Sequence, residues 1–522
     1  MANVMGMMVA TTTTAGVSSK KDAVTANGEM GNGSISELPD ETNRPNPVLG
    51  AKYVPLLMAT VLACWINLAC GASLGFTTPA LSDLKNNTSH LTLSEEEGTW
   101  MASLSMLGAM IGGLCAGPAI SFGRKKALWI AVFPLCAAWV LIVFAQAAWY
   151  LCVAQAIMGF STGVVSDAAQ LYVSETSTRR WRGALGCIPV LMFNAGMLVC
   201  YIAAYFMSWW TLAAFGACLT LPSVLAPCVL PETPVFLATK GKMKEACAAL
   251  RWFRGPECDM QEELQQLQYV ASLGRKGRPS LKGCVKVWRL LDKTLMKPFF
   301  HTLGIRILSR FCGIRPISSY LESIFSSTGS SINKEITTIA SGVAQIVGTV
   351  IACVLLHRIG RRSLLIWSQI VMGVSLVGLG LCIYFSNFFI NQETDMFGWL
   401  PFAAVVVYVV SNSVGLAPVS GIILSEIVPQ RFRSITSSST GALSWLSAFI
   451  VTKCFYVIEA GLKLHGAIWV FSVMCVLGAV YVYFLLPETR GLTQYEIDNL
   501  FVNDAEKNDE DKGQKQEATE TV

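Results

Sequence analysis

Three arginines lie in an otherwise apolar stretch of the chain. Arg306, Arg310 and Arg315 belong to "RILSRFCGIRPISSYLESIF", where a membrane-spanning helix is expected, and Gly313 and Pro316 are expected to break that helix before Arg315. The guanidinium group is a planar fork that suits a carboxylate or a phosphate. An ionisable residue inside a membrane helix is a functional candidate by default. These arginines therefore predict a site for an anionic or zwitterionic solute, unless they serve a structural role.

Two structural interpretations compete with solute binding. Arg306 lies within two turns of Lys297, at the expected cytosolic end of the helix, and its long apolar stem would let the charge reach water. One or more arginines would alternatively pair with Asp167, an acidic residue inside another apolar run. We expect a structural role for Arg306 and a cavity role for Arg310, which lies deeper.

The elements that position these residues are expected to be membrane helices. The chain has 522 residues, of which 53% are hydrophobic and 14% charged, and its mean hydropathy of +0.50 is far too high for a soluble globular protein of this size. About 20 apolar residues span a bilayer, and lipid offers no partner to backbone polar groups. Twelve such runs are present, at 54–77, 99–120, 127–145, 149–172, 183–205, 208–230, 299–325, 336–356, 364–386, 398–424, 438–459 and 466–486.

The distribution of charge predicts the orientation of these helices. Basic clusters such as "GRKK", "RRWR", "HRIGRR" and "QRFR" occupy alternate loops, whereas the opposite loops carry "SEEE" and "NQETD". By the positive-inside rule the basic loops and both termini face the cytosol. The sequence "NNTS" then places two overlapping glycosylation sequons, at Asn86 and Asn87, on the outer face.

Neither enzyme chemistry nor metal binding is expected. The 17 cysteines lie almost entirely in expected helices or in the cytosolic segment and form no CxxC pair, which favours a packing role. No nucleophile with its base, metal-ligand cluster or phosphate-binding glycine loop is recognisable, so no cofactor is predicted. Nucleic-acid binding is not predicted either, because topology explains each basic cluster.

Three pairs of motifs recur in the same order along the chain. "GRKKAL" returns as "GRRSLL", "SETSTRRWRG" as "SEIVPQRFRS", and "PETPVFLATKGK" as "PETRGLTQYEI". These repeats predict two related six-helix halves, the architecture of transporters that bind substrate near the midplane between two bundles. The expected parts are a disordered cytosolic tail over 1–50, an N-terminal bundle over 51–231, a central cytosolic segment over 232–297, a C-terminal bundle over 298–490 and a cytosolic tail over 491–522.

The repeated motifs also carry charges at the expected cytosolic ends of helices. Partly buried charge pairs between neighbouring helices can favour one of two packings by a few kcal/mol. A purely topological role would explain the basic residues but not the repeated glutamates. We therefore predict a cytosolic gate that consists of Glu175, Arg182, Glu426, Arg433, Arg124, Arg361, Arg362, Glu232 and Glu488.

These ordered motifs resemble those of the major facilitator superfamily, and specifically of its sugar porter family, over about residues 53 to 501. "GFTTPAL", "FIVTKCF" and "HGAIWVF" further resemble segments of insect facilitated trehalose transporters. The resemblance implies an all-α membrane protein with twelve transmembrane helices in two pseudo-symmetric six-helix bundles. In sugar porters, charges similar to the gate residues hold the outward-open state and separate when the inner gate opens.

The expected substrate site departs from the sugar porter pattern. Where the family's seventh helix resembles "QQLSGIN", whose amides bind sugar hydroxyls, this chain has "SRFCGIR"; "GPIPW" becomes "APVSG", and the eleventh-helix "NW" becomes Ser444-Trp445. Gln345 matches the family, whereas Val190 replaces a glutamine. Several uncharged partners for a neutral sugar are thus lost, and each buried polar group left unpaired costs about 1–3 kcal/mol. The expected cavity residues are Arg310, Arg315, Arg306, Gln345, Asp167, Pro418, Ser444 and Trp445.

The sequence predicts a carrier of small solutes that works by alternating access. Facilitative transport of trehalose or a hexose is the default, because the first helix has no carboxylate like that of proton-coupled sugar porters and an arginine partner would keep Asp167 ionised. Two alternatives remain: a carrier of an anionic or zwitterionic solute that uses the arginines, and a sensor that binds a solute without moving it. The expected partners are a small solute and the lipid bilayer of the cell membrane; no oligomeric state is predicted.

Overall fold

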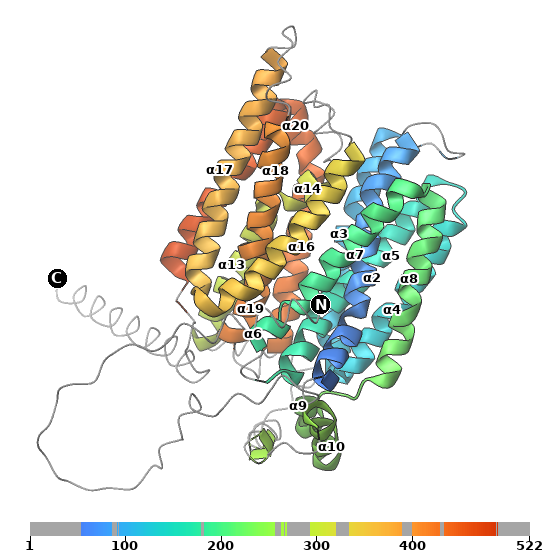
Figure 1. Ribbon diagram of the computed structural model, residues 1–522, viewed down its shortest axis with the longest axis vertical. Helices are drawn as coiled ribbons and strands as arrows, with labels where there is room; N and C mark the ends of the chain where they lie inside the picture. The colour runs from blue at the N-terminus through green and yellow to red at the C-terminus, as the bar shows by residue number, and fades with distance from the viewer. Residues whose placement is uncertain are drawn as a thin grey trace, which may run out of the picture. The chain divides into compact units, whose positions relative to one another are not determined.

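All regular structure in the described part of the chain is helical. The computed structural model describes residues 54–85, 91, 93–178, 182–255, 261, 263–265, 267–268, 293–319, 334–388, 399–428, 433–486 and 488. The two halves of the chain each form a bundle of helices (Figure 1). The bundles contact each other along two seams, where α3 packs against α20 and α7 packs against α16.

The first bundle has six long helices that are apolar enough to span a bilayer. Its core contains Trp139 and Phe76, which are fully buried and pack edge to face with ring centroids 5.6 Å apart. The long helices are α2 (Val54–Lys85), α3 (Glu95–Phe122), α4 (Arg124–Val143), α5 (Ala148–Thr176), α7 (Ile188–Phe206) and α8 (Trp209–Val229). Three shorter helices are α6 (Arg182–Leu185), α9 (Pro234–Thr239) and α10 (Met243–Arg254).

The second bundle repeats this arrangement with more interrupted helices. Its elements are α13 (Lys293–Phe311), α14 (Ile314–Ser319), α16 (Lys334–Arg358), α17 (Arg361–Phe388), α18 (Leu400–Ser411), the π-helix η4 (Asn412–Leu416), α19 (Ala417–Ile427) and α20 (Arg433–Leu485). Helix α20 contains two helical parts, because the backbone of Lys463 is left-handed, with φ of 59°. The continuous element α18–η4–α19 acts as a single span over residues 400–424.

The described helices account for twelve membrane spans. Ten helices are long and apolar enough to cross a bilayer, and α20 is long enough to hold two spans. The remaining span is α13 with α14, which carries too many charged residues to qualify by composition. Arg306 and Arg310 are two of the charged residues of this span.

Glycines allow helices of the first bundle to approach very closely. A Cβ atom on Gly159 of α5 would lie 1.9 Å from the backbone oxygen of Ser105 in α3, and one on Gly108 of α3 would lie 1.9 Å from that of Ala156 in α5. Such contact between backbones requires residues without side chains, as is common where membrane helices pack. The pairing of α3 with α5 therefore depends on these glycines.

Two helix interruptions lie near the middle of the second bundle. Helix α13 ends at Phe311, and Gly313 adopts φ of 83° before α14 begins, so the predicted break before Arg315 is confirmed. The ring of Phe471 leaves only 2.5 Å for a Cβ atom at Gly313, which is a second reason for glycine there. The π-helix η4 provides the other interruption, and π-helical turns are frequent at functional sites.

The two ends of the bundles can be distinguished by the short helices. Helices α9 and α10 lie near the beginning of α2 and the end of α5 (Figure 1), and we call this end of the molecule the α10 side. Helix α2 ends and α3 begins at the opposite side.

Candidate functional site

A cavity of about 220 Å³ lies between the two bundles. This volume is below the range of about 300–1,000 Å³ that is usual for sites of drug-sized ligands, so it suits a small solute. Half of the lining side chains are polar and uncharged, and both bundles contribute them. The cavity is lined by Asn67, Cys70, Thr162, Ser166, Gln170, Pro189, Val190, Phe193, Asn194, Met197, Ser309, Arg310, Ile314, Arg315, Ser318, Gln345, Asn412, Ser413, Leu416, Ala417, Ser420 and Trp445.

Arg310 lines this cavity from the last turn of α13. Its Nε donates a hydrogen bond of 2.9 Å to the hydroxyl of Ser444, and its guanidinium carbon lies 4.5 Å from the centroid of the Trp445 ring. A cation over the face of an indole ring is favourably placed. Ser444 and Trp445 therefore orient the guanidinium; Trp445 also lines the cavity, whereas Ser444 does not.

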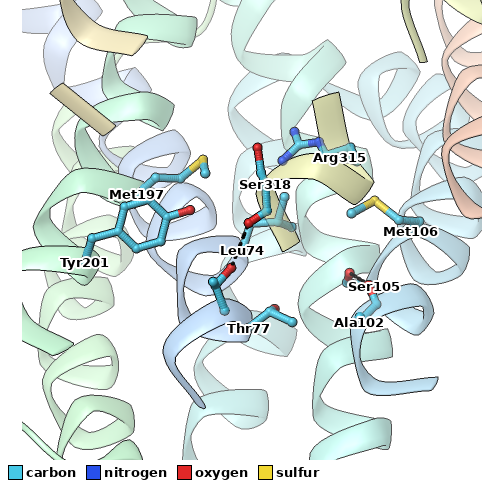
Figure 2. A pocket seen from close by; sticks show the side chains of 10 residues that line it. Leu74, Thr77, Ala102, Ser105, Met106, Met197, Tyr201, Arg315 and Ser318 are labelled. Atoms are coloured by element: carbon cyan, nitrogen blue, oxygen red, sulfur yellow. Dashed lines mark hydrogen bonds between the residues drawn. The ribbon is translucent and has the colours of Figure 1, made fainter. Parts of the chain in front are cut away.

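Arg315 lines the cavity from the first turn of α14. Its guanidinium carbon lies 5.6 Å from the ring centroid of Phe193 and 5.8 Å from that of Trp445, and its Nε is buried without a hydrogen-bond partner. Arg315 also borders a second, very small pocket of about 10 Å³ (Figure 2). Figure 2 shows this pocket between Arg315 and Ser318 of α14 and residues of α2, α3 and α7, namely Leu74, Thr77, Ala102, Ser105, Met106, Met197 and Tyr201.

Arg306 and Asp167 form an ion pair outside the cavity lining. The Arg306 Nη2 lies 3.5 Å from Asp167 Oδ1, which also accepts a hydrogen bond of 2.7 Å from the Ser437 hydroxyl. Arg306 Nη1 donates to the backbone oxygen of Ser437 at 3.4 Å. Asp167 lies in α5 and the other two residues in the second bundle, so the pair joins the bundles. The predicted pairing of Asp167 with an arginine is confirmed for Arg306, which contributes to this contact between the bundles.

Of two further residues expected in the cavity, Gln345 lines it and Pro418 does not. Gln345 lines the cavity from α16, and its backbone oxygen accepts a hydrogen bond of 2.8 Å from Thr349. The Thr349 hydroxyl in turn accepts one of 3.0 Å from Asn194 of α7, which links the bundles beside the cavity. Pro418 is buried in the first turn of α19 and does not line the cavity.

Sequence reasoning missed several amides of the cavity. Asn67 in α2, Asn194 in α7, Asn412 in η4 and Gln170 in α5 all line it, and the Asn67 Nδ2 is buried without a hydrogen-bond partner. The available signal was an amide inside an apolar run, where an unpaired polar group is costly. These residues restore part of the uncharged hydrogen-bonding capacity that the altered seventh-helix motif lacks.

The cavity extends toward the α10 side and is covered on the opposite side. Its lining follows α5 from Thr162 to Gln170, toward the end of that helix at the α10 side. On the opposite side, the Thr78 hydroxyl of α2 donates to the backbone oxygen of Ser318 in α14 at 3.5 Å. Lys453 of α20 adds a hydrogen bond of 3.1 Å to the Thr99 hydroxyl at the start of α3. The bundles therefore contact each other on the side away from α10.

A network of charges lies on the α10 side of the first bundle. Arg124 at the start of α4 forms an ion pair of 2.6 Å with Glu175 in the last turn of α5, and the other oxygen of Glu175 accepts a hydrogen bond from Thr233. Glu232 accepts hydrogen bonds from the backbone N–H groups of Arg124 and Lys125 at 3.0 and 3.1 Å. A carboxylate there satisfies free N–H groups and complements the dipole of α4.

The second bundle has the same network at the matching motif. Arg361 at the start of α17 pairs with Glu426 in α19 at 3.1 Å, and Glu488 accepts from the backbone N–H groups of Arg361 and Arg362 at 3.0 and 3.2 Å. Arg362 also donates to the backbone oxygen of Tyr483 at 2.5 Å. The repeated motifs thus form equivalent structures, and the ion pairs Arg124–Glu175 and Arg361–Glu426 each lie within one bundle, unlike Arg306–Asp167.

A comparison with protein families agrees with this duplicated, cavity-bearing architecture. The family model described as "Sugar (and other) transporter" matches residues 56–501. The chain belongs to the sugar (and other) transporter family. This transporter chain is 33% identical over 444 residues to the facilitated trehalose transporter Tret1 of Polypedilum vanderplanki, with 85% of this chain and 87% of that protein covered. It is 34% identical over 430 residues to the Tret1 of Bombyx mori, with 82% and 83% covered.

Solved structures confirm the fold expected for a sugar transporter. The proton:xylose symporter XylE bound to 6-bromo-6-deoxy-D-glucose matches with a TM-score of 0.72 and 22% identity, covering 86% of this chain and 100% of that chain. The inward-open conformation of XylE from E. coli matches with a TM-score of 0.66 and 20% identity, covering 85% and 99%. The prediction of twelve helices in two bundles of the major facilitator fold is therefore confirmed, as is a multi-pass membrane protein of a transporter family.

Some predicted residues of this sugar transporter fall outside the described part. The side chains of Arg182 and Arg433 are outside it, although both residues begin helices. The sequons at Asn86 and Asn87 are also outside the described residues. Their roles in gating and glycosylation stay predictions.

The carboxylate caps of the transporter provide a direct stability test. Glu232→Ala removes the acceptor for two N–H groups of α4, so we expect a loss of about 1–2 kcal/mol. Glu488→Ala should cost a similar amount at α17, and the two losses should add because the caps belong to different bundles. Thermal unfolding of the purified protein in detergent would measure both. Glu245→Ala, which breaks an exposed pair with Lys242, is the control. If Glu232→Ala has the same melting temperature as this control, the capping role is contradicted.

Proposed function

We propose that this transporter moves a small sugar-class solute across the membrane by facilitated diffusion, with its cavity exposed alternately to the two sides. The observation that carries the proposal is the cavity itself, which lies between two similar bundles and takes hydroxyl and amide groups from both. A solute held there would contact both bundles, so their relative rocking would expose it to either side.

The relatives indicate which solutes to test first. Trehalose is the solute in the names of the curated relatives, and neutral hexoses are the simpler members of the same class. Proton coupling is not part of the proposal, because the described residues that line the cavity include no carboxylate and Asp167 is paired with Arg306. The transporter then acts as a uniporter that follows the solute gradient.

The contacts at the two sides suggest how the bundles alternate. Thr78 with Ser318, and Lys453 with Thr99, would hold the side away from α10 closed and must separate when that side opens. The charged networks at Arg124 and the matching motif would stiffen the helix ends within each bundle, so that each bundle moves as a unit. Arg182 and the equivalent Arg433 are proposed to join the bundles when the α10 side closes. We further propose that the α10 side faces the cytosol, since the basic loops lie there, and that the protein resides in the cell membrane.

Counterflow into proteoliposomes tests this function. Vesicles loaded with unlabelled trehalose or glucose should take up the labelled form of the same solute transiently, saturably and without dependence on a proton gradient. Asn67→Ala should raise the half-saturating concentration about three- to tenfold, because the amide that it removes lines the cavity. The variant Thr211→Ala, in the first turn of α8 and outside the cavity lining, should behave as the native protein does.

The same assay separates a carrier from a sensor. A sensor would bind the solute and gain thermal stability from it, yet vesicles would show no flux above that of protein-free vesicles. That result, obtained with correctly folded protein and with every solute tested, would contradict the proposed function.

A further inference from the structure

The three arginines of the seventh span differ in their partners. Arg306 is paired with the Asp167 carboxylate at 3.5 Å. In the part of the chain that the structure describes, no carboxylate forms an ion pair with Arg310 or Arg315, and these are the two that line the cavity. Within this span, Arg306 therefore has a counter-ion from the protein, whereas Arg310 and Arg315 have none among the described residues.

Two uncompensated cations in this position require an explanation. Moving a guanidinium from water into the middle of a membrane protein is costly unless an opposite charge accompanies it. The π faces of Trp445 and Phe193 and the Ser444 hydroxyl offset part of this cost. None of these groups carries a negative charge. The described lining of the cavity thus presents two positive charges and no negative one to whatever enters.

The two guanidinium groups also have an aromatic ring in common. Both lie near the same indole ring, with their central carbons 4.5 Å (Arg310) and 5.8 Å (Arg315) from the centroid of Trp445. The only side-chain hydrogen bond of Arg310 to a described residue uses Nε, which leaves its two terminal nitrogens for another acceptor, and the buried Nε of Arg315 has no partner. Two guanidinium forks near one ring, each with unused donors, suit one carboxylate or phosphate group.

We propose that the solute of this cavity is an anionic sugar derivative, whose carboxylate or phosphate group is bound by Arg310 and Arg315 while its hydroxyl groups are bound by the amides. The inference rests on the proposed function, since it names the solute class of the same cavity. The unpaired amide of Asn67 and the neighbouring amides of Gln345 and Asn412 supply the uncharged donors and acceptors that a polyhydroxylated ring needs. The cavity is then matched to a solute that is polar along one part and charged at the other.

This assignment makes the movement of the solute sensitive to voltage. A uniporter that carries one net negative charge moves it against an inside-negative membrane potential. At equilibrium, about 59 mV of inside-negative potential lowers accumulation of a monovalent anion tenfold. The accumulation of a neutral sugar does not change with potential. Voltage dependence is therefore a readout that a purely structural role for the arginines would not produce.

A matched pair of solutes provides the experiment. D-glucuronate and D-glucose share a pyranose ring and differ at C6, where one has a carboxylate and the other a hydroxymethyl group. Binding to the purified protein is measured by equilibrium dialysis, and transport by counterflow in vesicles with a potassium gradient and valinomycin. Glucose 6-phosphate, as a competitor, distinguishes a phosphate site from a carboxylate site. The variants are Arg310→Gln and Arg315→Gln, with Arg251→Gln on the exposed face of α10 as the control.

The expected result is tighter binding of glucuronate or glucose 6-phosphate than of glucose. Each cavity variant should weaken anion binding roughly 10- to 100-fold, as expected when a charge-assisted hydrogen bond is lost, and should weaken the binding of glucose much less than that. Arg251→Gln should have no effect. Arg310→Lys should recover part of the affinity, since the charge returns without the fork.

The remaining outcomes separate this inference from the proposed function. Saturable flux of glucose or trehalose, with no binding of or competition by either anion, overturns the anionic solute and supports the transporter. Binding of an anion that depends on Arg310 and Arg315, without flux of any solute, supports the anion site and overturns transport. Anion binding that survives both substitutions overturns the assignment of these arginines. Absence of both binding and flux overturns both proposals.

Discussion

Asp167→Ala is expected to destabilise the folded transporter by about 3–5 kcal/mol. The substitution leaves Arg306, at the contact between the bundles, without its carboxylate and with only the backbone oxygen of Ser437 at 3.4 Å. The Ser437 hydroxyl also loses its acceptor at 2.7 Å. A cation left unpaired in a buried position costs far more than the pair itself contributes. Thermal unfolding in detergent should show a marked fall in melting temperature together with a loss of folded yield.

A double-mutant cycle identifies the cause of this loss. Arg306→Met alone should also be destabilising, because Asp167 then keeps only the Ser437 hydroxyl. The double variant Asp167→Ala, Arg306→Met removes both charges and should be more stable than Asp167→Ala alone. Glu245→Ala at the exposed pair with Lys242 should change stability by less than about 0.5 kcal/mol. A double variant no more stable than the single one would show that Asp167 acts through something other than its charge.

The sequence predicted much of this fold, because its signals are repeated and local. Three ordered motif pairs indicated two related halves, and the structure shows equivalent ion pairs at Arg124–Glu175 and Arg361–Glu426. The hydrophobic runs predicted the helices because lipid leaves the backbone no alternative. The separate runs predicted over 438–459 and 466–486 correspond to the two helical parts of α20, which the non-helical backbone of Lys463 separates.

The candidate site was less predictable, because it depends on contacts between distant segments. Asp167 and Ser437 are 270 positions apart, and no local pattern brings them together. The family motif drew attention to Pro418 in α19, but the neighbouring η4, with Asn412, faces the cavity. A π-helical turn leaves no clear sequence signature. Asn67 had a usable signal, an amide within an apolar run, which the motif comparison passed over.

Gly159→Leu is expected to prevent the close packing of α3 and α5 and to cost at least about 3 kcal/mol. A Cβ atom at this position would lie 1.9 Å from the Ser105 oxygen, which belongs to the backbone and cannot rotate away. The two helices would have to separate, and the contacts around Gly108 and Ala156 would be lost at the same time. Because α5 also carries Asp167, the shift should disturb the ion pair between the bundles. Folded yield and thermal stability after purification measure the effect.

Gly378→Leu in α17 is the matched control for this prediction. It makes the same substitution in another membrane helix, yet no atom lies within 4 Å of a Cβ atom there. Since leucine favours a helix over glycine by up to about 1 kcal/mol, the control should be neutral or slightly stabilising. Gly159→Ala should fall between the two, because its single methyl group already meets the same oxygen. If Gly159→Leu and Gly378→Leu unfold within about 2 °C of each other, the close approach of α3 and α5 is wrong.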